Sequence, residues 1–219
     1  MAAPLAGDSI GKKGTNMSDR LQKMSLPLLT AYAAAVAVWA AVNWGGLALT
    51  QQLAAIATAI VTCHEWEEQR FPGGFLELMG SILGLDTAGV EPHRMYSKPD
   101  VLIFVMTILA LALPQVPAFT CALLVLGCYE GLVHVMGIKL GKLSRPYTPG
   151  LVTAEVYAAF SIVGIVLIAR AGAAGALDWV LGIVWFILGF AVMEACVWRV
   201  VGLSPKEIPA KFRERIAGS

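Results

Sequence analysis

Residues 62–71, TCHEWEEQRF, place a histidine and three carboxylates directly after an apolar run that carries no charge from Leu53 to Cys63. Residues three and four positions apart share one face of a helix, so His64, Glu67 and Glu68 point the same way. Imidazole and carboxylate groups bind Zn, Fe or Mn, and they also transfer protons. The stretch therefore predicts a polar site at the end of an apolar helix, with Glu65 on another face and solvated.

A second apolar segment repeats this pattern in GCYEGLVHVMG (127–137), where Glu130 and His134 are four residues apart. Charged residues inside a membrane span cost about 2.5–3.5 kcal/mol each, so their retention indicates function. Di-iron bundles combine Glu-x-x-His helices with lone glutamates, a role open to Glu155 and Glu194 here. The predicted metal ligands are His64, Glu67, Glu68, Glu130, His134, Glu155 and Glu194, and the predicted catalytic residues are Glu67, Glu68 and Glu130.

Structural roles are the alternative for each of these residues. His64 could donate to a backbone carbonyl, Glu130 could form a buried hydrogen bond with His134, and Glu194 could pair with Arg199 or Arg145. His93, in VEPHRMY, is expected to be a surface histidine rather than a ligand.

The composition is that of an integral membrane protein. Of 219 residues, 58% are hydrophobic and only 14% are charged, whereas a soluble domain carries about 25% charged residues. The net charge of +1 gives no reason to expect a nucleic-acid partner. The four cysteines lie in apolar runs without a CxxC pair, and we expect them to be small buried residues.

Six apolar segments can be drawn, at about 27–49, 51–68, 100–116, 118–138, 151–170 and 177–201. Six spans with a cytoplasmic N-terminus place all 16 basic residues except Arg170 inside, as the positive-inside rule requires. The sequence thus predicts an all-α, polytopic membrane protein of about six transmembrane helices with both termini cytoplasmic. A four-span topology that omits the second and third segments is the alternative. In the six-span topology the polar cluster lies in the cytoplasmic half of the bilayer.

The predicted organisation is a loose cytoplasmic tail over residues 1–23, one helical transmembrane domain over 24–203 and a cytoplasmic C-terminal tail over 204–219. Within the 69–99 loop, the apolar stretch 74–85 is expected to lie flat at the interface or to be re-entrant. The segment RPYTPGLVTAE (145–155) predicts a fixed turn capped by Thr148, with Arg145 and Tyr147 at the mouth of the site.

These strings resemble a known family. HEWEE (64–68) followed by QRFPGGF (69–75), then GLVHVMG (131–137) and YTPGLVTA (147–154), is similar to the HXXEE family of bacterial membrane proteins over roughly residues 30–170. The resemblance implies a multi-span helical fold and a role for His64, Glu67, Glu68 and His134. It implies no particular activity.

The function predicted from the sequence is a membrane metalloenzyme, a hydrolase or an oxidoreductase, that uses Fe, Zn or Mn on a lipidic or apolar substrate. Two alternatives stay open: a metal-free acid–base isomerase of a lipid or terpenoid, and a cation- or proton-binding transport protein. The predicted partners are the bilayer and a lipidic small molecule, and the small residues of ARAGAAGA (169–176) allow a homo-oligomer. The predicted location is the cytoplasmic membrane of a bacterium.

Overall fold

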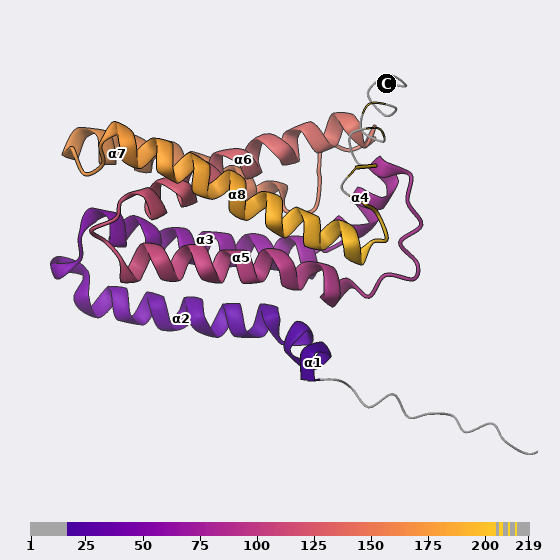
Figure 1. Ribbon diagram of the computed structural model, residues 1–219, viewed down its shortest axis with the longest axis horizontal. Helices are drawn as coiled ribbons and strands as arrows, with labels where there is room; N and C mark the ends of the chain where they lie inside the picture. Colours follow the sequence, from indigo (N-terminus) through magenta and orange to yellow (C-terminus); the bar gives the residue numbers. More distant parts are fainter. Residues whose placement is uncertain (1–16, 205, 208–209, 211–212, 214–219) are drawn as a thin grey trace, which may run out of the picture.

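Six long helices form a bundle in which each helix runs antiparallel to the next one along the chain (Figure 1). Short turns connect them at one end of the bundle and longer segments at the other. The computed structural model describes residues 17–204, 206–207, 210 and 213, and these contain helices but no strand. The predicted all-α fold is confirmed. The elements are α1 (Met17–Lys23), α2 (Ser25–Asn43), the 3-10 turn η1 (Trp44–Gly46), α3 (Leu49–Gln69), α4 (Phe75–Leu83), α5 (Pro92–Ala112), α6 (Ala118–Leu140), α7 (Leu151–Ala171) and α8 (Ala176–Val200).

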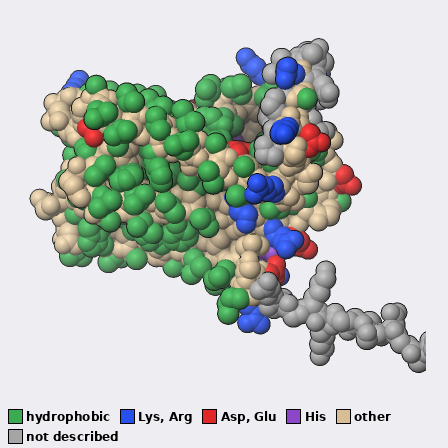
Figure 2. Space-filling view, viewed as in Figure 1, with side chains coloured by type: hydrophobic (Ala, Val, Ile, Leu, Met, Phe, Trp, Pro, Cys, Tyr) green, Lys and Arg blue, Asp and Glu red, His purple; other side chains and the backbone are tan. Residues whose placement is uncertain are grey.

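Five helical segments are long and apolar enough to cross a membrane: α2 with η1, α5, α6, α7 and α8, each of 21 to 25 residues. In Figure 2, hydrophobic side chains cover the flank of the bundle, while most of the charged side chains gather at the end that carries α1 and α4. This distribution fits insertion in a bilayer. The remaining predicted segment, the second at about 51–68, corresponds to α3, which has 21 residues but ends in a cluster of charges.

Helix α3 lies at the centre of the bundle, in contact with α2, α5, α6 and α7. Its small residues allow this close approach, since Ala54, Ala57 and Thr58 are fully buried. The hydroxyls of Thr58 and Thr62 each donate to the carbonyl four residues earlier, so no polar group is left without a partner there. Because it packs against four other helices, α3 carries its charged last turns into the interior of the polar end.

Glycines hold α6 and α7 together. A Cβ on Gly127 would collide with Ser161 Oγ and would lie 2.6 Å from the Tyr157 ring, and a Cβ on Gly131 would lie 2.7 Å from Ala158 Cβ. Tyr157 is fully buried and donates to the carbonyl of Leu123, 2.9 Å away. The two helices that flank the predicted site are therefore fixed against each other by backbone-to-side-chain packing.

The third predicted segment begins earlier than expected. Residues 92–99, which were predicted to be loop, form the first two turns of α5, because Pro92 suits the first turn of a helix. His93 consequently lies on α5 rather than in a loop, and its Nε2 is 2.8 Å from the Asp19 carboxylate of α1. The predicted stop at residues 114–117 is confirmed, since α5 ends at Ala112.

The predicted tails and cysteines agree only in part with the structure. Residues 17–23 are helical rather than loose, whereas residues 1–16 and most of 205–219 lie outside the described residues. The apolar stretch 74–85 forms the short helix α4 at the polar end of the bundle (Figure 1). Cys121 is buried as predicted, but Cys63 is exposed on the side of the bundle.

Replacing Gly127 with alanine should destabilise the protein by about 1–3 kcal/mol, because the new methyl group overpacks the contact between α6 and α7. Thermal unfolding in detergent measures the effect. Gly189→Ala on α8 is the matched control, since its Cβ would meet only the tip of Leu102, at 3.0 Å. Equal losses of stability in the two variants would contradict this description of the helix contact.

Candidate metal centre in the helical bundle

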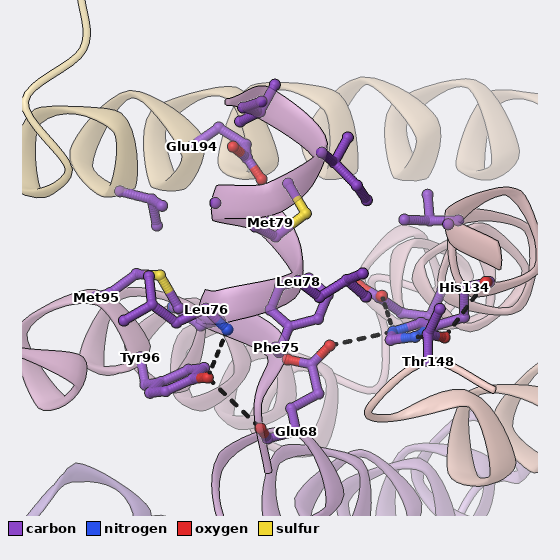
Figure 3. A pocket seen from close by; sticks show the side chains of 18 of the residues that line it. Glu68, Phe75, Leu76, Leu78, Met79, Met95, Tyr96, His134, Thr148 and Glu194 are labelled. Carbon is purple, nitrogen blue, oxygen red and sulfur yellow. Dashed lines mark hydrogen bonds and ion pairs between the residues drawn. The ribbon is translucent and has the colours of Figure 1, made fainter. Parts of the chain in front are cut away.

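Two histidines and two glutamates, from α3 and α6, meet inside the polar end of the bundle. Figure 3 shows Glu68 and His134 of this group, joined by a dashed line. Glu68 Oε1 lies 3.6 Å from Nε2 of His64 and 3.1 Å from Nε2 of His134. Glu130 Oε2 lies 3.7 Å and 3.8 Å from the same two nitrogens. Both histidines are 2% exposed. The structure thus brings together the i, i+4 pairs that the sequence predicted on two separate helices.

The opposite nitrogen of each imidazole binds the turn before α7. His64 Nδ1 is 3.2 Å from the carbonyl oxygen of Gly150, which can only accept a hydrogen bond. His134 Nδ1 is 3.0 Å from the hydroxyl of Thr148, and that hydroxyl donates to the His134 carbonyl. Both Nδ1 atoms are therefore the donors. In the neutral rings, Nε2 is left as a lone-pair acceptor facing the carboxylates.

In this arrangement the two Nε2 atoms and the carboxylate oxygens that face them are all hydrogen-bond acceptors, and none of the described residues places a donor between them. Nε2 of His134 has no hydrogen-bond partner among the described residues, although Glu68 Oε1 is only 3.1 Å away. Ligand atoms about 2.0–2.2 Å from a tetrahedral ion lie about 3.3–3.6 Å apart, close to the 3.1–3.8 Å separations seen here. The group of His64, Glu68 and His134 could hold a metal ion, since its ligand atoms all lie within 4.8 Å of one another.

Glu67 binds the N-terminus of α7. Its carboxylate accepts from the backbone N–H groups of Val152 and Thr153 at 3.2 Å and 2.8 Å, from the Thr153 hydroxyl and from Tyr147 Oη at 2.9 Å. A carboxylate is stabilised at a helix N-terminus by the free N–H groups and by the helix dipole. Glu67 thus fixes the turn that orients both histidines, and its predicted role as a ligand or catalytic group stays a prediction.

Tyr147 links this turn to α3. Partial burial, together with the hydrogen bond to the Glu67 carboxylate, raises the pKa of Tyr147 to about 12. The phenol is therefore protonated at neutral pH and serves as a donor to Glu67. Arg145, which we also expected at the mouth of the site, is exposed on the same turn.

Three other glutamates lie outside this group. Glu155 is exposed on α7, and the structure does not bring it to the histidines. Glu194, on α8, reaches the same cavity as the histidines, but it lies more than 4.0 Å from their nitrogens. The expectation that Glu65 is solvated is wrong: it is 3% exposed and shares the Gln69 side-chain amide with Asp100 of α5.

A cavity of about 500 Å³ adjoins the histidines, within the size range of small-molecule sites. Apolar side chains of α4, α5, α6 and α8 line most of it, and the ring of Phe75 lies 5.7 Å from that of His134. Leu132 and Met136 line the cavity and are also 59% and 47% exposed on the flank of α6. The cavity therefore reaches the surface that would face lipid.

Gly150 was not predicted as part of the site. Its φ is +92°, and a Cβ there would lie 2.6 Å from Cε1 of His134 and 2.8 Å from Cε1 of His64. Only a residue without a side chain lets the backbone pass this close to both rings. The YTPG turn in the sequence was the signal for this position, but the contacts depend on how α3, α6 and α7 pack.

The fold and the site together define a helical membrane protein with a buried His/Glu group beside an apolar cavity. Comparison of the chain with protein families, with curated proteins and with solved structures gave no match.

Gly150→Ala should lower the affinity for Zn²⁺ by about 10–100-fold, the usual effect of disturbing the groups that orient metal ligands. Zn²⁺ titration of the metal-free protein in competition with a chelating dye measures this. Gly74→Ala is the matched control, because Gly74 has a similar φ of +98° but room for a Cβ, with its nearest contact at 3.7 Å. An unchanged affinity in Gly150→Ala would show that the turn does not orient the ligands.

Proposed function

We propose that the protein is a membrane-embedded metalloenzyme that binds one divalent cation through His64, Glu68 and His134 and acts on an apolar substrate in the adjoining cavity. One observation carries the proposal. Two buried Nε2 acceptors lie 3.6 Å and 3.1 Å from the same carboxylate oxygen of Glu68, while the Nδ1 atoms are bound to the 148–153 turn. Buried acceptors that face each other need a cation between them, either a metal ion or a proton.

The types of ligand atom limit which metal ions could bind. Two histidines and one carboxylate with an open position are the ligands of zinc hydrolases and of non-haem iron(II) oxygenases. When bound, such a metal would activate water or dioxygen. Glu130 lies beside the group, 3.7 Å and 3.8 Å from the two Nε2 atoms, and is placed to accept a proton at the open position.

The cavity supports a lipidic substrate. Its lining is largely apolar, and its exposed edge at Leu132 and Met136 lies on the flank of a helix that could span the membrane. A hydrophobic molecule dissolved in the bilayer could enter there without crossing water. The charge pattern supports a cytoplasmic position for this end of the bundle, and the HXXEE resemblance supports a bacterial membrane protein.

A metal-free acid–base enzyme is the second candidate. The 3.1 Å separation of Glu68 and His134 would also suit a shared proton, which a carboxyl–imidazole pair could pass to and from a lipid double bond. The two candidates differ in whether the purified protein retains a stoichiometric metal.

His64→Ala and His134→Ala should each lose most of the bound metal, because each removes one of the two nitrogen ligands. Inductively coupled plasma mass spectrometry on untagged protein, purified in detergent, measures Zn, Fe and Mn per chain. His93→Ala is the control, since His93 is the third histidine of the chain and binds Asp19 instead. If the wild type carries no metal even after supplementation, the metalloenzyme is excluded and acid–base chemistry becomes the better account.

Glu130→Gln should retain the metal at close to wild-type stoichiometry, whereas Glu68→Gln should lose most of it. The reason is that Glu68 is a member of the ligand group, while Glu130 lies at its edge. The same mass spectrometry measures both variants, with Glu155→Gln as the exposed control. A loss of metal in Glu130→Gln equal to that in Glu68→Gln would make Glu130 a ligand instead.

A further inference from the structure

The carboxylate of Glu194 on α8 also lines the cavity. Its Oε2 atom is buried and has no hydrogen-bond partner among the described residues. The basic residues that could have paired with it are placed elsewhere: Arg145 is exposed, and Arg199 lines a separate pocket with Arg94 and Lys98. A buried carboxylate oxygen without a donor is costly, so its position in a cavity indicates that a ligand supplies the donor.

Glu194 is separate from the metal group. Neither histidine has a ring nitrogen within 4.0 Å of it, although all three residues line the same cavity. In Figure 3, Glu194 projects from α8 towards Met79 of α4, whereas Glu68 and His134 lie on the far side of Phe75 and Leu78. Glu194 and the histidine group thus occupy two separate positions on the cavity wall, with the side chains of Phe75 and Leu78 between them.

The apolar lining is adaptable. Four methionines contribute to it, Met79, Met95, Met136 and Met193, from four different helices. Methionine is unbranched and polarisable, so such a lining can accept flexible chains of varied shape. The cavity edge at Met136 is exposed on the flank of the bundle, which gives a chain from the bilayer a way in.

We propose that Glu194 anchors the substrate, by accepting a hydrogen bond from a hydroxyl or ammonium group on a long hydrocarbon chain. The chain fills the apolar region, and this places another part of the molecule at the His64, Glu68 and His134 group. The inference deepens the proposed function, because it names the substrate class as a long-chain amphiphile with a donor group. An anionic amphiphile such as a fatty acid should bind less tightly, because an ionised carboxylate has no donor to offer Glu194.

The test is equilibrium binding of radiolabelled 1-dodecanol, dodecylamine and dodecanoate to the protein in nanodiscs, corrected for uptake by empty nanodiscs. The wild type should bind the alcohol, the amine or both at least about tenfold more tightly than dodecanoate. Glu194→Leu should lose that preference by about tenfold or more, as expected for a hydrogen bond to a charged group. Glu194→Gln, which keeps the shape, should lose the amine preference most.

Controls separate this inference from the metal proposal. Glu155→Leu, at an exposed position on α7, should bind all three probes as the wild type does. Metal content is measured on the same samples, and Glu194→Leu should retain it. Unchanged probe binding in both Glu194 variants would overturn the inference, and so would loss of metal in Glu194→Leu, which would make Glu194 a ligand. Selective probe binding by a wild type that lacks metal would support the anchor while removing the metalloenzyme.

Discussion

The site depends on the hydrogen bonds from two imidazole Nδ1 atoms to the turn before α7. A neutral imidazole has one donor and one acceptor, so committing both donors to Gly150 and Thr148 forces both acceptors towards Glu68. The turn itself is held by Glu67, which accepts from the first N–H groups of α7. One motif on α3 therefore supplies His64 and Glu68, two members of the group that could hold a metal ion, and Glu67, which fixes the turn that orients both histidines. The apolar cavity lies beside this group.

Much of the fold and of the candidate site could be predicted from the sequence. Helical spacing was sufficient to pair His64 with Glu68 and Glu130 with His134, because positions four apart share a face whatever the tertiary structure. The similar depth of the two pairs in the cytoplasmic half of the predicted spans then indicated that they belong to one site. The six helices followed from the apolar runs and the breaks between them, and the all-α fold is confirmed.

The remaining features depend on packing between helices, which spacing does not determine. Both Glu155 and Glu194 were candidate lone glutamates in the sequence, yet Glu155 is exposed and Glu194 lines the cavity. The difference depends on which face of α7 and of α8 packs towards the bundle interior. Glu65 looked like a solvated charge, but the central position of α3 buries it beside Asp100. The role of Gly150 could not be predicted from the sequence either, since its contacts arise only where three helices meet.

The most direct test of the central claim is X-ray absorption spectroscopy of the purified protein at the edge of its bound metal. The account predicts two imidazole nitrogens at about 2.0–2.1 Å, with oxygen donors completing the shell and the multiple-scattering pattern of histidine rings. Loss of the bound ion in both His64→Ala and His134→Ala would complete the assignment. A shell made only of oxygen, or an ion still bound after both histidines are replaced, would contradict it.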